Sequence, residues 1–301
     1  MALLISPSWF CEILASMPEL PEVETVANSV KERVRGQRIE SVWLSSKPQT
    51  FKTPAAEMAE QLRGRRIEQV RRVGKHIVFD LSSAQARDSP PVQWIVHLGM
   101  TGRLLVSAAD VGLAMHTHAV LGLSSGRELR FVDPRRFGRL AIHELDAPAQ
   151  PGGDPMQGGF TGPGREPLTI SLPEFLGLFR GRRLAIKSAL LNQKLLHGVG
   201  NIYADESLFR ARIRPKRMAG RLRRAELERL YVGLQSVLRE AIALGGSSVS
   251  DYVDADGAKG FFQVEHRVYM RTGQPCLVCG SPIRRITLGG RGTHFCAACQ
   301  K

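Results

Sequence analysis

The chain has 301 residues, of which 43% are hydrophobic, so it can bury a sizeable core and is long enough for two domains and a small module. Its formal net charge of +14 favours a polyanionic partner, with nucleic acid as the leading candidate and an anionic membrane surface as the alternative. No apolar run approaches the roughly 20 residues of a membrane span, and the N-terminal residues lack the basic start of a secretory signal. We therefore expect a cytoplasmic protein.

The first sixteen residues differ in composition from the rest of the chain. They contain Cys11 and Glu12 but no Lys or Arg. We expect residues 1–16 to be a non-native leader, produced by a misassigned start codon, and the working protein to begin at Met17-Pro18-Glu19. Taken alone, a proline followed by glutamates is typical of an ordinary helix start, because proline lacks an N–H and carboxylates suit the helix dipole.

An N-terminal β-sandwich or barrel with one leading helix is predicted for residues 17–145. Apolar residues recur every three or four positions from Val23 to about Arg35, which predicts a helix ended by Gly36. Short runs rich in Val, Ile and Leu follow, separated by Gly, Ser, Asp and Pro, as is typical of strands. The predicted strands are Ile39–Leu44, Ile67–Val73, His76–Leu81, Gln93–Leu98, Arg103–Val106, His118–Leu123 and Leu129–Val132.

A linker and a helical domain are predicted next. Residues 146–168 are dominated by Pro and Gly and have no periodicity, so we interpret them as the linker. Residues 169–263 have helical spacing and end in a long glycine-rich loop, 245–262, of a length that usually has a function. The predicted helices are Leu172–Arg182, Ala185–Leu196, Asn201–Ile213 and Arg224–Leu244. Val264–Met270 is predicted to be a strand that leads into the last module, 264–301.

Four of the five cysteines form two C-x-x-C pairs, Cys276/Cys279 and Cys296/Cys299. Two such pairs supply four thiolates for a tetrahedral metal and leave no open position, which predicts one structural Zn²⁺ in a small β-hairpin module. Two redox pairs or four buried thiols are the alternatives. Arg284, Arg285 and Arg291 lie between the pairs and suit a DNA backbone, although a solvated charged face is also possible for each.

Basic residues are densest between Arg180 and Arg229, where 14 Lys or Arg accompany four acids. Within this stretch, HGVG precedes a helix opened by Asn201, and the free amides of such a helix start can bind phosphate. An ordinary glycine-rich turn with an Asn cap is an equally good interpretation.

The segments HLGMTGR and DPRRFGR place Met100, Arg135 and Phe137 beside glycines in predicted tight turns. In a very basic protein, large side chains on loops suggest wedges between DNA bases, whereas the ordinary place for Met and Phe is the core. Lys75, at the start of a predicted strand, is ordinarily a solvated lysine.

These motifs occur in one order: PELPEVE at Pro18, GKHIVFDL with Lys75, HLGMTG, DPRRFG, GVGNIYADE and the terminal cysteine pairs. Together they resemble the formamidopyrimidine-DNA glycosylase family of bacteria over residues 17–301. The resemblance implies an α+β multidomain fold with a helix-two-turn-helix DNA-binding domain, and an enzyme that removes oxidised purines from duplex DNA and cleaves the resulting abasic site. It implies no small-molecule cofactor, no membrane partner, and a monomer as the expected state.

The resemblance also implies catalytic roles. Pro18 would be the nucleophile whose amine forms a Schiff base with the sugar, and β,δ-elimination would follow. Glu19 would protonate the opening sugar, Glu22 would support it, and Lys75 would contact phosphate near the lesion.

Further residues acquire roles by the same resemblance. Asn201 and Arg291 match phosphate ligands, and Lys187 matches a lysine near the site. Glu206 would maintain the geometry of the site, and loop 245–262 would cover the extruded base. The remaining expected DNA-binding residues are His116 and three that fill the gap left by the base: Met100, Arg135 and Phe137, with Arg135 facing the orphaned cytosine.

The sequence differs from the family pattern in two places, and two other functions remain open. The linker reads TGPGREPL where the family has LGPEPL, and the leader would leave Pro18 without a free amine. A preference for oxidised pyrimidines, as in the related endonuclease VIII enzymes, is one alternative. A non-catalytic DNA-binding homologue is the other.

Overall fold

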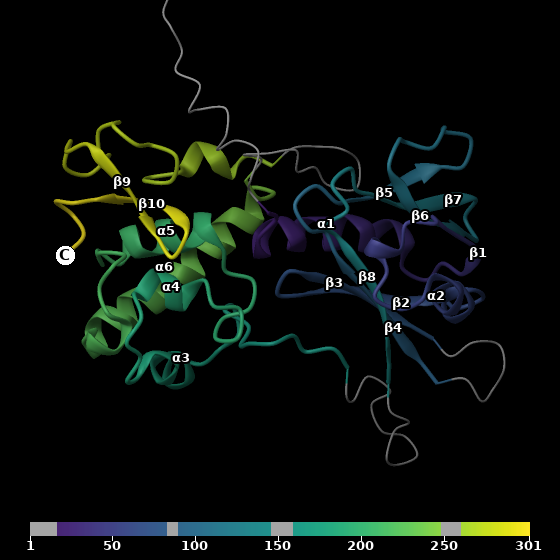
Figure 1. The fold of residues 1–301 in the computed structure, drawn as a ribbon, viewed down its shortest axis with the longest axis horizontal. Helices are drawn as coiled ribbons and strands as arrows, with labels where there is room; N and C mark the ends of the chain where they lie inside the picture. The colour runs from purple at the N-terminus through teal and green to yellow at the C-terminus, as the bar shows by residue number, and fades with distance from the viewer. Residues whose placement is uncertain (1–16, 83–89, 146–158, 248–259) are drawn as a thin grey trace, which may run out of the picture. The chain divides into compact units, whose positions relative to one another are not determined.

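The computed structural model describes residues 17–82, 90–145, 159–247 and 260–301, in two compact units (Figure 1). Of the described residues, the first unit contains Met17, Pro18, Glu22–Phe160, Ser247 and Gly260, and the second contains Glu19–Pro21, Thr161–Gly246 and Phe261–Lys301. The predicted leader, the linker up to residue 158 and residues 248–259 of the predicted loop lie outside the described residues.

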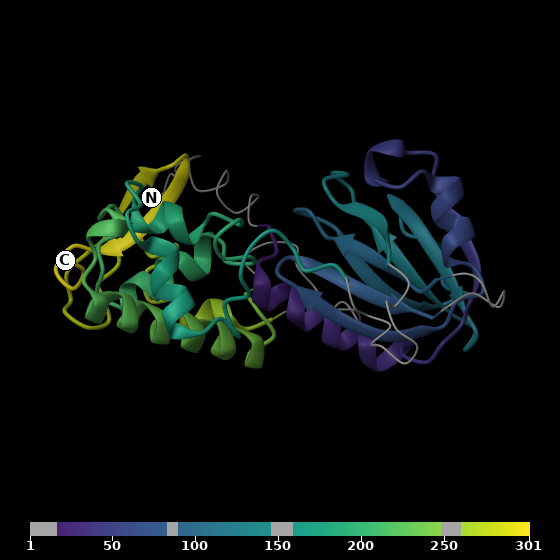
Figure 2. The same cartoon turned by 90° about the horizontal axis from the view of Figure 1, so that it is seen from below.

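The first unit contains two four-stranded antiparallel sheets, ordered β1-β6-β7-β5 and β2-β3-β4-β8. Helix α1, Leu20–Val34, runs alongside these strands (Figure 2) and buries Val23, Val26, Val30 and Val34 in the same hydrophobic core as both sheets. The predicted β-sandwich with its leading helix is thereby confirmed. The strands are β1 Ile39–Leu44, β2 Ile67–Val73, β3 His76–Leu81, β4 Val92–His97, β5 Arg103–Ala108, β6 Thr117–Leu123, β7 Arg127–Val132 and β8 Arg139–Glu144.

Three elements of this unit were not predicted. Strand β8 has no Val, and Leu140 is its only fully buried residue, so its sequence lacks the usual strand pattern. Helix α2, Ala55–Leu62, buries only Met58 and Leu62, one pair at a four-residue spacing. A short 3-10 turn, η2 Pro48–Thr50, precedes it.

The second unit is mainly helical, as predicted, and ends in the hairpin of β9, Ile283–Leu288, and β10, Arg291–Cys296. Helix α3 begins with a capping box formed by Ser171 and Glu174. The helices are α3 Leu172–Phe179, α4 Ile186–Leu190, α5 Asn201–Arg210 and α6 Arg224–Ala243, with 3-10 turns η3 Ala219–Arg221 and η4 Phe262–Glu265. Within the described ranges, no helix is long and apolar enough to cross a membrane.

Two predicted elements of this unit were wrong in extent or type. The helix predicted over Ala185–Leu196 ends at Leu190, and the following turn is held by the Gln193 side chain, whose amide donates to the carbonyls of Leu191 and Val199. The segment Val264–Met270 is not a strand. Its backbone N–H groups donate to a buried carboxylate rather than to a neighbouring strand, as described below.

Candidate functional site

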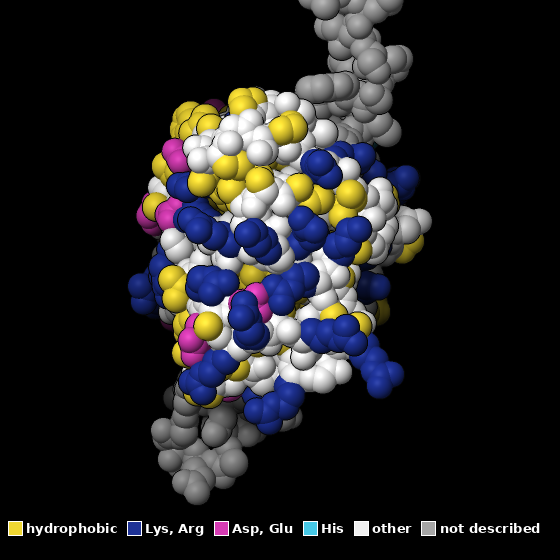
Figure 3. Space-filling model, turned by 90° about the vertical axis from the view of Figure 1, so that its left-hand side faces the viewer, with side chains coloured by type: hydrophobic (Ala, Val, Ile, Leu, Met, Phe, Trp, Pro, Cys, Tyr) yellow, Lys and Arg dark blue, Asp and Glu magenta, His cyan; other side chains and the backbone are white. Residues whose placement is uncertain are grey.

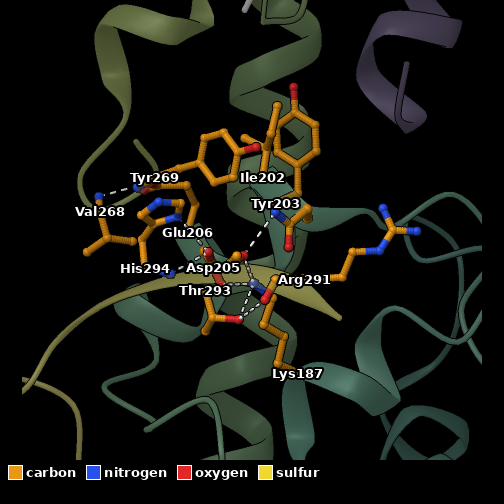
Figure 4. Close-up of polar contacts among 12 residues, drawn as sticks. Lys187, Ile202, Tyr203, Asp205, Glu206, Val268, Tyr269, Arg291, Thr293 and His294 are labelled. Carbon is orange, nitrogen blue, oxygen red and sulfur yellow. Dashed lines mark hydrogen bonds and ion pairs between the residues drawn. The ribbon is translucent and has the colours of Figure 1, made fainter. Parts of the chain in front are cut away.

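A buried polar cluster joins α4, α5 and the C-terminal hairpin in the second unit (Figure 4). Lys187 of α4 is fully buried, and its Nζ lies 2.6 Å from Oδ1 of Asp205 on α5. The same ammonium donates to the Gly292 carbonyl and to Thr293 Oγ1, both at 2.9 Å. Burial lowers the pKa of Lys187, and the charge of Asp205 opposes that shift.

Glu19 lies at the N-terminus of α5. Its side chain is buried, and its two carboxylate oxygens accept hydrogen bonds from the backbone N–H groups of Ile202, at 3.0 Å, and Tyr203, at 3.4 Å. These are amides of the first turn that have no partner within the helix, and the helix dipole favours a negative charge there. A Cβ on Gly200 would lie 2.2 Å from Cδ of Glu19, so the close approach requires glycine at this position. The helix therefore holds the Glu19 carboxylate in one place.

Asn201 and Arg291 are brought together by a shared neighbour. Asn201 Nδ2 donates to the Gly292 carbonyl at 3.1 Å, the same oxygen that accepts from Lys187. Arg291, which precedes Gly292, is exposed, and its side chain extends away from the buried pair (Figure 4). The predicted residues Glu19, Lys187, Asn201 and Arg291 thus belong to one local arrangement.

Glu206 is completely buried and faces the segment that leads into the cysteine module. Its carboxylate accepts hydrogen bonds from the backbone N–H groups of Arg267 at 3.0 Å, Val268 at 2.9 Å and Tyr269 at 2.8 Å. Burial raises the pKa of Glu206, and these hydrogen bonds oppose the rise. Glu206 thus fixes the backbone of the segment from Arg267 to Tyr269.

Three other predicted catalytic residues lie in the first unit. Pro18 is buried directly before Glu19 in the chain. Glu22 is buried, and one of its carboxylate oxygens accepts from the Ser247 N–H at 2.7 Å. Lys75, in the turn between β2 and β3, is only 8% exposed, so the ordinary explanation of a solvated lysine is wrong.

The two loops that carry Met100, Arg135 and Phe137 are packed together in the first unit. A Cβ on Gly99 would lie 2.4 Å from the backbone nitrogen of Gly138, so the two backbones touch. Phe137 is 46% exposed, and the exposed Arg135 guanidinium stacks 4.8 Å from its ring centre, whereas Met100 is half-buried. The exposure of Phe137 contradicts its interpretation as a core residue.

Asp133 connects these two loops and was not predicted. Its Oδ1 accepts from Thr101 Oγ1 at 2.6 Å, and its Oδ2 accepts from the Gly138 N–H at 2.7 Å. Its own N–H donates to the carbonyl of the exposed His116, which has a positive φ of 68°. His116 therefore lies beside the loops that carry the predicted wedge residues. The aspartate stands within the DPRRFG motif, so its place in that motif could have indicated it.

The four cysteines of the C-terminal module form one cluster, in which all four Sγ atoms lie within 4.8 Å of one another. The Sγ atoms of Cys276 and Cys299 are 3.9 Å apart, and those of Cys279 and Cys296 are 3.5 Å apart. A tetrahedral site with Zn–S bonds of about 2.3 Å requires S–S separations of about 3.8 Å. The cluster therefore fits a zinc ion with four sulfur ligands and no open position.

Positive charge is abundant on one face of the second unit (Figure 3), where many Lys and Arg side chains and few acidic ones are visible. The exposed arginines of this unit include Arg180, Arg182, Arg183, Arg221, Arg223 and Arg224. This surface can attract a polyanion over a distance set by the ionic strength.

Family models match three parts of the chain: the formamidopyrimidine-DNA glycosylase N-terminal domain at residues 17–140, the H2TH domain of the same enzymes at 164–253, and a zinc finger found in FPG and IleRS at 273–301. The third match and the cysteine geometry together assign one structural Zn²⁺ to the module.

Curated relatives and solved structures agree with these matches. The chain is 40% identical to formamidopyrimidine-DNA glycosylase of Listeria monocytogenes and 44% identical to that of Solibacter usitatus, in both cases over 95% of this chain and 100% of the relative. It resembles the MutM (Fpg) structure from Thermus thermophilus with a TM-score of 0.78 and 41% identity, covering 94% of this chain and 98% of that one. A Lactococcus lactis Fpg mutant bound to DNA containing Fapy-dG gives a TM-score of 0.82 and 31% identity, covering 94% and 100%. The chain therefore belongs to the formamidopyrimidine-DNA glycosylase family.

Proposed function

We propose that this protein is a bifunctional DNA glycosylase and abasic-site lyase that excises oxidised purines, such as 8-oxoguanine and formamidopyrimidines, from duplex DNA. The observation that carries the proposal is the placement of Glu19. The residue directly after the proposed nucleophile has its carboxylate fixed by two backbone N–H groups of α5, next to the cluster that positions Asn201 and Arg291. A fixed carboxylate beside the reacting amine is what this chemistry requires.

In the proposed reaction, the Pro18 nitrogen bonds to C1′ of the damaged nucleotide and the bond from C1′ to the base breaks. The base leaves with the electron pair of that bond and takes up a proton from solvent. The Glu19 carboxylate accepts the proton that the Pro18 nitrogen releases and passes it to O4′ as the sugar ring opens, which leaves an iminium between Pro18 and C1′. Loss of a proton from C2′ then expels the 3′ phosphate, and a second elimination expels the 5′ phosphate. An α-amine titrates near pH 8, so a useful fraction of Pro18 is neutral at pH 7.

This chemistry needs a secondary amine at Pro18. We therefore propose that the active form begins at Pro18, after initiation at Met17 and removal of that methionine. We likewise propose functional boundaries at residues 17–145, 146–168, 169–263 and 264–301, and a monomer acting on chromosomal DNA in the bacterial cytoplasm.

The remaining predicted residues would bind the DNA. Lys75, Asn201 and Arg291 would contact phosphates around the lesion, with Glu22 supporting the site. The exposed Arg135 and Phe137, with Met100 and His116 nearby, would occupy the gap left by the extruded base, and Arg135 would face the orphaned cytosine. The four cysteines would hold the zinc, which supplies a structural crosslink for the Arg291 hairpin.

Borohydride trapping on two matched duplexes tests the proposal. The form that begins at Pro18 should become covalently attached to DNA containing 8-oxoguanine opposite cytosine, and more slowly to DNA containing thymine glycol. Faster attachment to thymine glycol would favour the endonuclease VIII-like alternative. Tight binding without attachment to either duplex would favour a non-catalytic homologue.

A further inference from the structure

Asp205 is fully buried and joins two segments that are far apart in the sequence. Its Oδ1 lies 2.6 Å from Lys187 Nζ on α4. Its Oδ2 accepts from the backbone N–H of His294 on β10 at 2.8 Å. One carboxylate on α5 therefore holds both α4 and the zinc hairpin.

The segment that it holds directly follows Arg291. The Gly292 carbonyl accepts from Lys187 and Asn201, Thr293 Oγ1 accepts from Lys187, and the His294 N–H donates to Asp205. The turn before Arg291 consists of Gly289 and Gly290, both with positive φ. Glycines restrict the backbone least, so these polar contacts fix the position of Arg291 more than the turn does.

Lys187 has no N–H left for DNA in this arrangement. An ammonium group has three donors, and here Asp205, the Gly292 carbonyl and Thr293 Oγ1 occupy them. The side chain is completely buried, so it does not face a phosphate. The lysine acts on the site through Gly292.

A buried ion pair is a poor source of net stability, because the desolvation of two charges offsets their attraction. Two apolar side chains could fill the same volume, but they could not bind a carbonyl oxygen, a hydroxyl and a backbone N–H of β10. The Lys187–Asp205 pair is thus better explained by its orientation of the β10 backbone than by any stability that it adds.

We propose that Asp205 is a positioning residue: through Lys187 and the backbone of β10, it places Arg291 beside Asn201 so that both bind one DNA phosphate. The proposal rests on the proposed function, in which Arg291 and Asn201 are phosphate ligands. Asp205 itself touches no substrate in this scheme.

The salt dependence of DNA binding tests the proposal. Affinity is measured between about 50 and 200 mM salt for a duplex with a reduced abasic site, which cannot react. The logarithm of the binding constant falls linearly with the logarithm of the salt concentration, and each neutralised phosphate contributes about 0.9 to that slope. Arg291→Gln should reduce the slope by about 0.9 and affinity about tenfold. Asp205→Asn should do nearly the same, although it removes a negative charge, and the double variant should be no worse than Arg291→Gln alone.

Glu226→Gln provides the matched control. Glu226 is a buried carboxylate of the same unit that pairs with Arg217 and not with Lys187 or β10, and its loss changes the net charge equally. The control should lose stability and keep the full salt slope. If Asp205→Asn keeps the full slope, or its loss adds to that of Arg291→Gln, the positioning role is refuted.

Asp205→Asn leaves Lys187 buried without a counterion and therefore destabilises the fold. The double variant Lys187→Met with Asp205→Asn removes both charges and still frees Gly292, so it should show the same loss of slope, and an unchanged slope would overturn the proposal. If the wild-type protein itself does not bind the duplex, the proposed function fails. If the wild-type protein binds the duplex but the Asp205 variants keep the full salt slope, as Glu226→Gln does, then the positioning role of Asp205 fails and the proposed function stands.

Discussion

Gly200→Ala should displace the Glu19 carboxylate and slow base excision. The new Cβ would lie 2.2 Å from Cδ and 2.4 Å from Oε1 of Glu19, whereas carbon atoms in contact are about 3.5–4.0 Å apart. The carboxylate must therefore move by more than about 1 Å, and a displacement of that size can cost about 100-fold in rate. It would also lose its hydrogen bonds to the N–H groups of Ile202 and Tyr203.

The assay is single-turnover excision of 8-oxoguanine with saturating enzyme, so that the rate reports the bound complex. The φ of Gly200 is −129°, which any residue can adopt, so the change acts through the clash and not through backbone strain. Gly177→Ala in α3 is the matched control, because its Cβ would have no neighbour within 4 Å, and it should excise at the wild-type rate. A Gly200→Ala enzyme that is folded and as fast as wild type would refute the placement of Glu19 as the proton donor.

Other predictions concern the metal, the exposed loop and acid stability. Chelation of zinc should abolish DNA binding together with the fold of the hairpin, as followed by fluorescence anisotropy and circular dichroism, and restored zinc should recover both. Phe137→Ala should leave the melting temperature within about 2 °C, because the ring is 46% exposed, yet weaken binding to lesion-containing duplex. The Arg217 hydrogen bond lowers the pKa of Glu226 from 4.5 to about 2, so Glu226 stabilises the fold above its unfolded pKa and this contribution is lost as pH falls towards 2. Urea unfolding of Glu226→Gln should therefore differ most from wild type at neutral pH, and a difference that is constant with pH would contradict the ion pair.

The sequence predicted the elements whose pattern is strong and local. The stripe of Val23, Val26 and Val30 in α1 is one example, and the twin cysteine pairs are another. Strand β8 was missed because it has no Val and its only fully buried residue is Leu140, whereas β1, which also has one fully buried residue, contains Ile, Val, Trp and Leu. Local patterns thus fail where a strand has neither a buried period nor the usual strand composition.

In the candidate site, too, the sequence indicated what has a local pattern and missed what depends on distant residues. Residues within recognisable motifs, such as Glu19 and Asn201, could be selected from the sequence, although their contacts could not. Val264–Met270 has the composition of a strand, but the backbone N–H groups of this segment are taken by Glu206, which lies some 60 positions earlier. The role of Asp205 depends on Lys187 and His294, which are separated from it by 18 and 89 positions, and no local pattern carries such contacts.

The identity of the nucleophile is the central claim, and peptide mass spectrometry of the borohydride-trapped complex tests it most directly. Protein that begins at Pro18 is trapped on DNA containing 8-oxoguanine and digested, and the residue that carries the sugar fragment is identified. We predict attachment to the Pro18 nitrogen and no attachment for a chain that retains residues 1–16. Attachment to a lysine, or equal trapping with residues 1–16 present, would contradict the account.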